Sequence, residues 1–144
     1  MALTHLVHRL GGYVSLVSNR DGSYRDASGS TLAATIANLK QQNIVFDQVI
    51  LANYKTSQHP SDKNPRFNAV IYGHYDSHEM VWSKRLPPHQ VIAYFGDNIQ
   101  DFPRFKQAAV DALPDDSKTY EVFGAGYFIL PNPMYGSWEA NRYH

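Results

Sequence analysis

The 144-residue sequence contains no cysteine, which excludes disulfide bonds and thiolate metal sites. It also lacks an excess of either charge. The 13 Lys and Arg residues balance 13 Asp and Glu residues, so neither nucleic acid nor an anionic membrane is expected as a partner. No apolar run approaches the roughly 20 residues needed to span a bilayer. The first residues, MALTHLVHRLGG, do not have the pattern of a secretory signal peptide.

The composition fits one globular domain over residues 1–144. Hydrophobic residues make up 43% of the chain and aromatic residues 13%. A chain of this length and composition can bury a core without disulfide bonds. We find no internal repeat, linker or low-complexity segment that would divide it.

Strand-like and helix-like segments alternate along the chain. Apolar, β-rich runs predict strands at 13–19, 48–54, 91–95 and 127–131. Helical periodicity predicts helices at 2–10, 31–42, 66–73 and 103–113, with Ser30 as an N-cap and 73–90 as a long irregular connection. This alternation predicts an α/β fold, in which a parallel sheet carries helices on both faces.

Polar residues follow several of the predicted strands. Ser18 and Asn19 end the first strand, Asp97 follows the third, and Lys63 lies just before a helix. Ligand sites in parallel sheets lie beyond the carboxyl ends of the strands. A hydroxyl, an ammonium group and the backbone amides at a helix start suit phosphate oxygens, and carboxylates suit Mg²⁺. The pattern therefore favours phosphoryl chemistry.

Four short motifs occur in a recognisable order. They are LVSNR at 16–20, KNPRF at 63–67, GDNIQDF at 96–102 and ILPNPMYGSWE at 129–139. Together they resemble the haloacid dehalogenase (HAD) superfamily, subfamily IIIB, which includes the class C acid phosphatases and 5′-nucleotidase relatives. The resemblance covers nearly the whole chain and implies a Rossmann-like sheet.

The resemblance implies a role for each polar residue at the predicted sheet edge. Ser18 would bind the transferring phosphoryl group and Lys63 would neutralise it. Asp97 would bind Mg²⁺ directly, and Asp101 would support the site from behind. The implied activity is Mg²⁺-dependent hydrolysis of phosphomonoesters.

Three further residues are assigned to substrate binding. Asn19 lies within LVSNR and Arg66 within KNPRF, which resemble the second and third motifs of the family, and Tyr135 matches an aromatic residue that holds the leaving group. The implied substrate is a small phosphomonoester such as a nucleoside monophosphate. Arg66 has two alternatives: it positions Lys63 or an acid, or it is a surface residue. Tyr135 also has an alternative in ordinary packing, since the chain contains 10 tyrosines.

The sequence departs from the family at its first motif. Family members begin with a strand ending in Asp-x-Asp, whose first Asp forms an aspartyl phosphate. No Asp-x-Asp occurs in this sequence, and neither Asp21 nor Asp26 has that spacing. The chain therefore resembles the C-terminal part of a HAD phosphatase core, with the first central strand missing. An artificial truncation, a misplaced start codon and an evolutionary remnant all remain open as explanations.

Two functions follow from this departure. In the first, the intact protein is a phosphatase that works through an aspartyl phosphate, and this chain alone is inactive. In the second, the chain is a non-catalytic α/β module for binding or assembly. The missing strand would leave unpaired edges, which makes a homodimer plausible. An exported or periplasmic location is expected only if the intact protein carries a signal peptide.

The acidic pair and its neighbours also have purely structural interpretations. Asp97 and Asp101 suit capping of a helix that starts near Pro103. Ser18 suits a turn at a strand end, and Lys63 suits a solvated loop.

A histidine pair has the spacing of a metal site. His74 and His78 would lie one turn apart on a helix. Gly73 and the surrounding loop-like residues argue against a helix there. Two histidines without a third ligand do not indicate a metal site.

Overall fold

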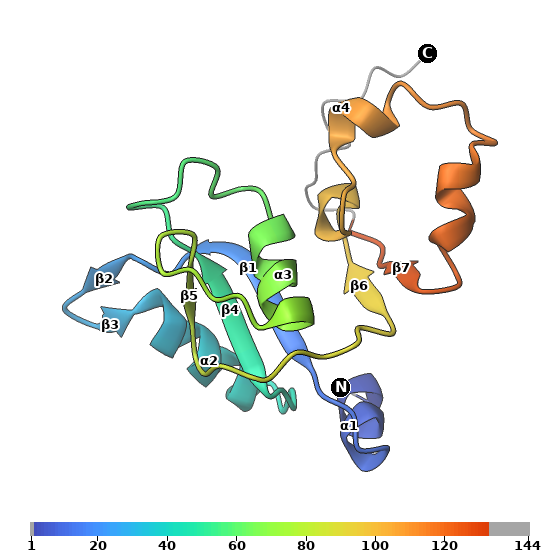
Figure 1. Cartoon of the computed structure of the whole chain (residues 1–144). Helices are drawn as coiled ribbons and strands as arrows, with labels where there is room; N and C mark the ends of the chain where they lie inside the picture. The colour runs from blue at the N-terminus through green and yellow to red at the C-terminus, as the bar shows by residue number, and fades with distance from the viewer. Residues whose placement is uncertain (1, 133–144) are drawn as a thin grey trace. The chain divides into compact units, whose positions relative to one another are not determined.

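The computed structural model describes residues 2–132 and contains two compact units, Met1–His89 and Gln90–His144. Each unit contains one pair of parallel strands (Figure 1). The predicted α/β fold with parallel strands is therefore confirmed, whereas the single domain over 1–144 stays a prediction. In the described part of the chain, no helix combines the length and apolar character that crossing a bilayer requires.

The first unit is built around a three-stranded sheet of order β1-β4-β5. β1 pairs parallel with β4, and β5 pairs antiparallel with β4. The expectation that 73–90 is wholly irregular is wrong, because β5 lies within it; a strand of three residues is too short to show periodicity. The helices are α1 (Ala2–Arg9), α2 (Thr31–Gln41) and α3 (Asn64–Tyr72), and the strands are β1 (Ser15–Asp21), β2 (Arg25–Asp26), β3 (Gly29–Ser30), β4 (Gln48–Ala52) and β5 (Met80–Trp82).

β4 forms the centre of the first unit. All five of its residues are buried, so both faces of the strand are covered. Ile50 packs with Ala69 of α3 and with Met80 of β5 on one face. Successive side chains alternate between faces, and α2 also contacts β4 (Figure 1). Helices therefore cover both faces of this sheet, as predicted.

The ends of α2 and α3 follow from local sequence. The Ser30 side chain accepts a hydrogen bond from the backbone nitrogen of Ala33 at 3.2 Å, which confirms it as the N-cap of α2. At the other end of α3, Gly73 adopts a left-handed conformation with φ of 71°. Its N–H bonds to the carbonyl of Ala69, so a glycine is required where the helix stops.

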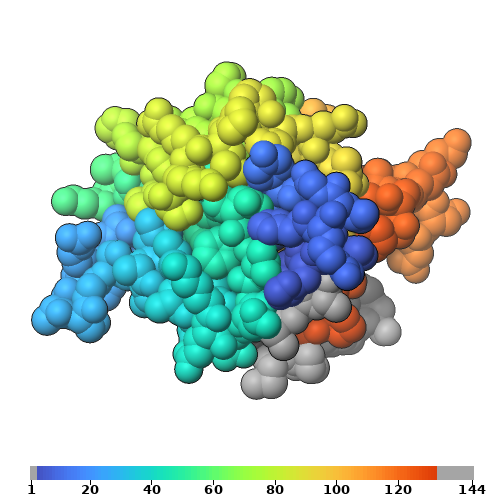
Figure 2. Space-filling model, turned by 90° about the horizontal axis from the view of Figure 1, so that it is seen from below, coloured from blue at the N-terminus to red at the C-terminus, as the bar shows by residue number. Residues whose placement is uncertain are grey.

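α1 is attached to the loop before β4 by two histidines. Nε2 of His8 lies 2.7 Å from Oδ2 of Asp47, and Nε2 of His5 lies 3.2 Å from the carbonyl oxygen of Asn43. Figure 2 shows α1, in dark blue, beside the blue-green surface of this loop. The helix is thus held by polar contacts, and its leucines are substantially exposed.

β2 and β3 form a small antiparallel hairpin before α2. Its pairing is limited to two residue pairs, Arg25 with Ser30 and Asp26 with Gly29. Residues 24–29 are exposed, and Figure 2 shows the hairpin as a blue projection from the first unit. The hairpin adds little to the core.

The second unit has less regular structure than the sequence predicts. The strand expected at 91–95 lies at 94–96, and β6 and β7 pair in parallel. The expectation of a helix over 103–113 is wrong, because only α4 is helical there. Phe102 is extended and Arg104 has a φ of 68°, which the right-handed helix does not allow. The elements are β6 (Tyr94–Gly96), η1 (Ile99–Asp101), α4 (Gln107–Val110), η2 (Lys118–Val122) and β7 (Tyr127–Ile129).

The core of the second unit is aromatic. The side chain of Phe102 is 1% exposed. Its ring lies 5.0 Å from that of Phe123 and 5.3 Å from that of Tyr127, between ring centroids. Phe105 joins the same cluster through Phe123. These rings pack the segment after η1 against β7.

Candidate functional site

The carboxyl end of β1 is irregular at the predicted phosphate-binding residues. The strand continues to Asp21, beyond the predicted end, and its register with β4 shifts between Ser18 and Asp21. The backbone nitrogen of Arg20 donates to Oγ of Ser18 at 3.2 Å. Such bulges turn side chains away from the regular alternation of a strand. Ser18 and Asn19 therefore stand at a point where the strand redirects its side chains.

Asn19 connects the end of β1 to the segment that leads into α3. Its Oδ1 accepts a hydrogen bond from Nη2 of Arg66, and its Nδ2 donates to the carbonyl oxygen of Ser61 at 3.1 Å. Nη1 of Arg66 also donates to the carbonyl oxygen of Pro60 at 3.2 Å. The structure thus brings together the predicted site residues Asn19 and Arg66.

Arg66 is a buried cation. Its side chain is 1% exposed, so the alternative of a surface residue is wrong. Within residues 2–132 it forms no ion pair within 4.0 Å, and its Nε has no hydrogen-bond partner. Burial lowers the pKa of Arg66, while the negative charges of Asp62 and Glu79 act in the opposite direction. An arginine remains cationic at neutral pH despite such a shift.

Lys63 is the N-cap residue of α3 and is half-buried. The helix start does not offer its first amides to an anion. The N–H of Asn64 donates to Oδ1 of Asp62 at 2.9 Å, Pro65 has no N–H, and the N–H of Arg66 donates to the carbonyl of Lys63. The expectation that this helix start provides amides for phosphate is therefore wrong.

The acidic pair after β6 has two different environments. Oδ2 of Asp101 accepts hydrogen bonds from the backbone nitrogens of Asp97 and Asn98, at 3.1 and 3.2 Å. Together with the Asn98 side chain, this forms a capping box on η1. A Cβ on Gly96 would lie 2.3 Å from Cβ of Asp101, so only glycine fits there. Asp101 thus holds the loop, and it caps η1 rather than a helix at Pro103.

Asp97 is the exposed member of the pair. Its Oδ2 accepts a hydrogen bond from Nδ2 of Asn132, just after β7, at 2.7 Å. The Asp97 carboxylate is a hard donor of the kind that Mg²⁺ prefers, and Mg²⁺ commonly takes only one or two carboxylates from a protein. Across residues 2–132, no group of three His, Cys, Asp or Glu could hold a metal ion. The Asp97 carboxylate therefore fits Mg²⁺ as one ligand of a partial set.

The predicted site residues fall into two groups. Ser18 and Lys63 belong to the first unit, and Asp97 and Asp101 belong to the second. Their convergence on one crevice stays a prediction. Tyr135 lies outside the described residues.

The histidine pair does not lie on a helix. α3 ends at Tyr72, and neither His74 nor His78 is helical. His74 instead packs near the ring of Tyr72, at 5.9 Å between centroids. The expectation that these residues are not helical is confirmed.

Several contacts of the site were not predicted from the sequence. The carbonyls of Pro60 and Ser61 hold the Arg66 and Asn19 side chains, which no side-chain pattern reveals. Asp62 was also missed, although an Asp just before a helix is a recognisable signal for binding first-turn amides. The sequence predicts a strand that ends just before Asn132, but it does not indicate the contact of Asn132 with Asp97.

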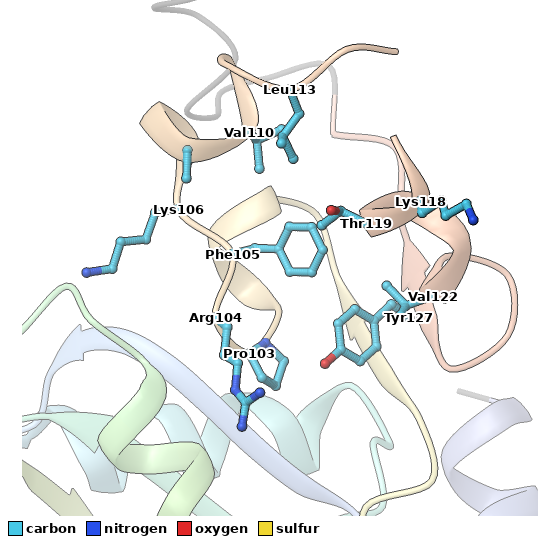
Figure 3. Close-up of a pocket in the computed structure, with 11 residues that line it drawn as sticks. Pro103, Arg104, Phe105, Lys106, Val110, Leu113, Lys118, Thr119, Val122 and Tyr127 are labelled. Atoms are coloured by element: carbon cyan, nitrogen blue, oxygen red, sulfur yellow. The ribbon is translucent and has the colours of Figure 1, made fainter. Parts of the chain in front are cut away.

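A separate hollow of about 350 Å³ lies in the second unit. Figure 3 shows Phe105 and Tyr127 directed into it, whereas the ammonium group of Lys118 points away. None of the predicted site residues lines this hollow. Its apolar walls distinguish it chemically from the polar loops at Ser18 and Asp97.

Comparison with known proteins identifies the family. No curated protein and no solved structure matches the chain. The family model for the HAD superfamily, subfamily IIIB (acid phosphatase), matches residues 1–138. The matched range includes the irregular end of β1, the start of α3 and the acidic loop after β6. The chain belongs to subfamily IIIB of the HAD superfamily, a family of phosphatase-type hydrolases.

Proposed function

We propose that the chain carries the phosphate-binding and metal-binding residues of a Mg²⁺-dependent phosphomonoesterase. The proposed substrates are small phosphomonoesters such as nucleoside monophosphates. The observation behind the proposal is the hydrogen bond that Arg66 donates to Asn19. This bond links the end of β1, where Ser18 lies, to α3, which begins directly after Lys63. Membership of an acid phosphatase family supports the reaction class.

Each residue has a proposed chemical role. The Ser18 hydroxyl donates a hydrogen bond to a phosphate oxygen, and the Lys63 ammonium group offsets the phosphate charge. Asp97 would hold Mg²⁺, which when bound neutralises charge on the phosphoryl group. Asp101 keeps the backbone of Asp97 in place through the hydrogen bond described above.

The attacking group is an aspartate that these 144 residues do not provide in an Asp-x-Asp motif. The Oδ1 atoms of Asp21 and Asp26 already accept hydrogen bonds from Ser23 and Ser28, which makes them poor substitutes. In the intact protein, the aspartate would attack phosphorus and displace the alcohol of the phosphomonoester by breaking its P–O bond, and water would then hydrolyse the aspartyl phosphate to release inorganic phosphate. We propose that this chain alone does not turn over phosphomonoesters. Loss of a nucleophile costs about 10⁶-fold in rate in well-studied hydrolases.

A non-catalytic module is the second candidate, favoured by the missing Asp-x-Asp motif. β1 is the end strand in the order β1-β4-β5, so within the described residues one of its edges has no strand partner. A second copy of the chain pairing along this edge would give a homodimer.

A binding and activity experiment separates the two candidates. The purified chain is titrated with inorganic phosphate and with Mg²⁺ while amide NMR signals are followed, and it is assayed with p-nitrophenyl phosphate. The phosphatase proposal expects phosphate to shift signals at Ser18 and Lys63, Mg²⁺ to shift those at Asp97, and no measurable hydrolysis. Absence of both shifts would favour the assembly module. Mg²⁺-dependent hydrolysis that is lost in Asp97→Asn would show that the proposed inactivity is wrong.

A further inference from the structure

We infer that Arg66 and Asn19 are positioning residues, which act by fixing the end of β1 against the start of α3. Their hydrogen bond would set the spacing between Ser18 and Lys63 without either residue contacting the substrate. The functional part of this inference rests on the proposed phosphate site. The structural part stands on the contacts of the first unit alone.

The pair joins segments that are distant in sequence. Asn19 and Arg66 are separated by 47 positions. Asn19 directly follows Ser18, and Arg66 lies three positions after Lys63. A single hydrogen bond therefore connects the residue after Ser18 with the residue three positions after Lys63.

The geometry leaves the Asn19 side chain little freedom. Its amide accepts from Arg66 through Oδ1 and donates to Ser61 through Nδ2, so a rotation by 180° would break both hydrogen bonds. Arg66 in turn reaches Pro60 with its other terminal nitrogen. The guanidinium group thus bonds at the same time to β1, through Asn19, and to the loop before α3, through Pro60. A single ammonium group cannot reproduce this geometry.

Burial separates this role from substrate binding. With 1% of its surface exposed, Arg66 has almost no area to offer a ligand. A buried cation held only by neutral oxygens is a costly way to fill space, since it gives up hydration without gaining a close carboxylate. The cost of burying Arg66 is explained if the site requires the two terminal nitrogens of a guanidinium group.

The test is a double-mutant cycle with Arg66→Lys and Asn19→Ala. Two readouts are the amide NMR signals of Ser18, Ser61 and Lys63, and the dissociation constant for inorganic phosphate. We expect each single variant to shift these signals and to weaken phosphate binding about tenfold, as for loss of a hydrogen bond to a charged group. The double variant should be no worse than the weaker-binding single variant.

Matched controls use exposed residues of the same types, Asn68→Ala on α3 and Arg25→Lys on β2. Both should leave the three signals and phosphate binding unchanged. Additive effects in the cycle, or unmoved signals in folded variants, would overturn the inference. If the wild-type chain binds no phosphate, the proposed function fails, and the coupled signal shifts alone decide the positioning role.

A second variant covers the case in which Arg66→Lys does not fold. Asn19→Asp keeps an acceptor for Arg66 and removes the donor to Ser61. We expect the Ser61 signal to shift while the Lys63 signal stays in place. A Lys63 shift as large as that in Asn19→Ala would contradict the inference.

Discussion

Oδ2 of Asp101 lies 3.1 Å from the backbone nitrogen of Asp97, so one carboxylate of the acidic pair holds the backbone that carries the other. Asp97 itself is exposed and bonded to Asn132. The two acids therefore have different roles. The Asp101 carboxylate bonds to the backbone of the loop, whereas Asp97 is exposed. This division explains why an acidic pair follows a short strand.

Gly96→Ala should destabilise this loop. The added Cβ would lie 2.3 Å from Cβ of Asp101, so the backbone or Asp101 must move. We expect a loss of about 1–3 kcal/mol in the free energy of unfolding, measured by chemical denaturation. Gly126→Ala is the control, because its Cβ would meet only Ile92 at 3.7 Å. Equal losses in both variants would contradict the steric explanation.

Asp101→Ala should remove the capping box of η1. The backbone amides of Asp97 and Asn98 lose their acceptor, which we expect to cost about 1 kcal/mol of unfolding free energy. The same variant should shift the amide NMR signal of Asp97. Asp115→Ala removes an exposed carboxylate and serves as the control. An unmoved Asp97 signal would show that Asp101 does not position its partner.

Asp21→Asn should change the acid sensitivity of the fold. Burial alone would raise the pKa of Asp21, but hydrogen bonds from the side chain and amide of Ser23 and the amides of Tyr54 and Tyr24 bring it below its ordinary value of 3.8. A carboxyl group with a lowered folded-state pKa stabilises the protein above the ordinary value, and this stabilisation is lost as pH falls through the folded pKa.

The pH dependence of unfolding tests this assignment. Between about pH 5 and pH 3, the unfolding free energy of the wild type should fall more steeply than that of Asp21→Asn. Asp115→Asn should keep the wild-type slope. Parallel curves for the wild type and Asp21→Asn would rule out a role for this carboxylate.

Phe102→Ala should strongly destabilise the second unit. Among its described residues, Phe102 is the one fully buried apolar side chain. Its loss should cost about 3–5 kcal/mol, and Phe102→Leu should cost less. Hydrogen exchange at the amides of β6 and β7 reports this unit directly. Ile92 is 83% exposed. Ile92→Ala should therefore change the free energy of unfolding by less than about 0.5 kcal/mol.

The first unit was largely predictable from its sequence because local signals and burial agree there. Ser30 is a strong N-cap followed by a helical stripe, and α2 begins where this pattern predicts. β4 is an apolar run buried on both faces. β5 was missed because only three residues pair, and their partner is set by β4 rather than by local pattern.

The second unit was less predictable because its backbone breaks the expected periodicity. Arg104 has a positive φ in the middle of a helix-like pattern, and no rule for arginine anticipates this. At the site, residue types and strand ends indicated Asn19 and Asp101. Asn19 bonds to the Arg66 side chain and to a loop carbonyl, and Asp101 bonds to loop amides; only the folded chain brings these groups into reach.

The exposed β2–β3 hairpin is a suitable site for limited proteolysis and for labelling. Arg25 lies on this projection, with β1 before it and β4 after it in the chain. Trypsin should nick such a loop tip while the flanking core remains intact. The parallel ladder between β1 and β4 would then hold two polypeptides together. The same hairpin should accept a spectroscopic label or a short affinity tag.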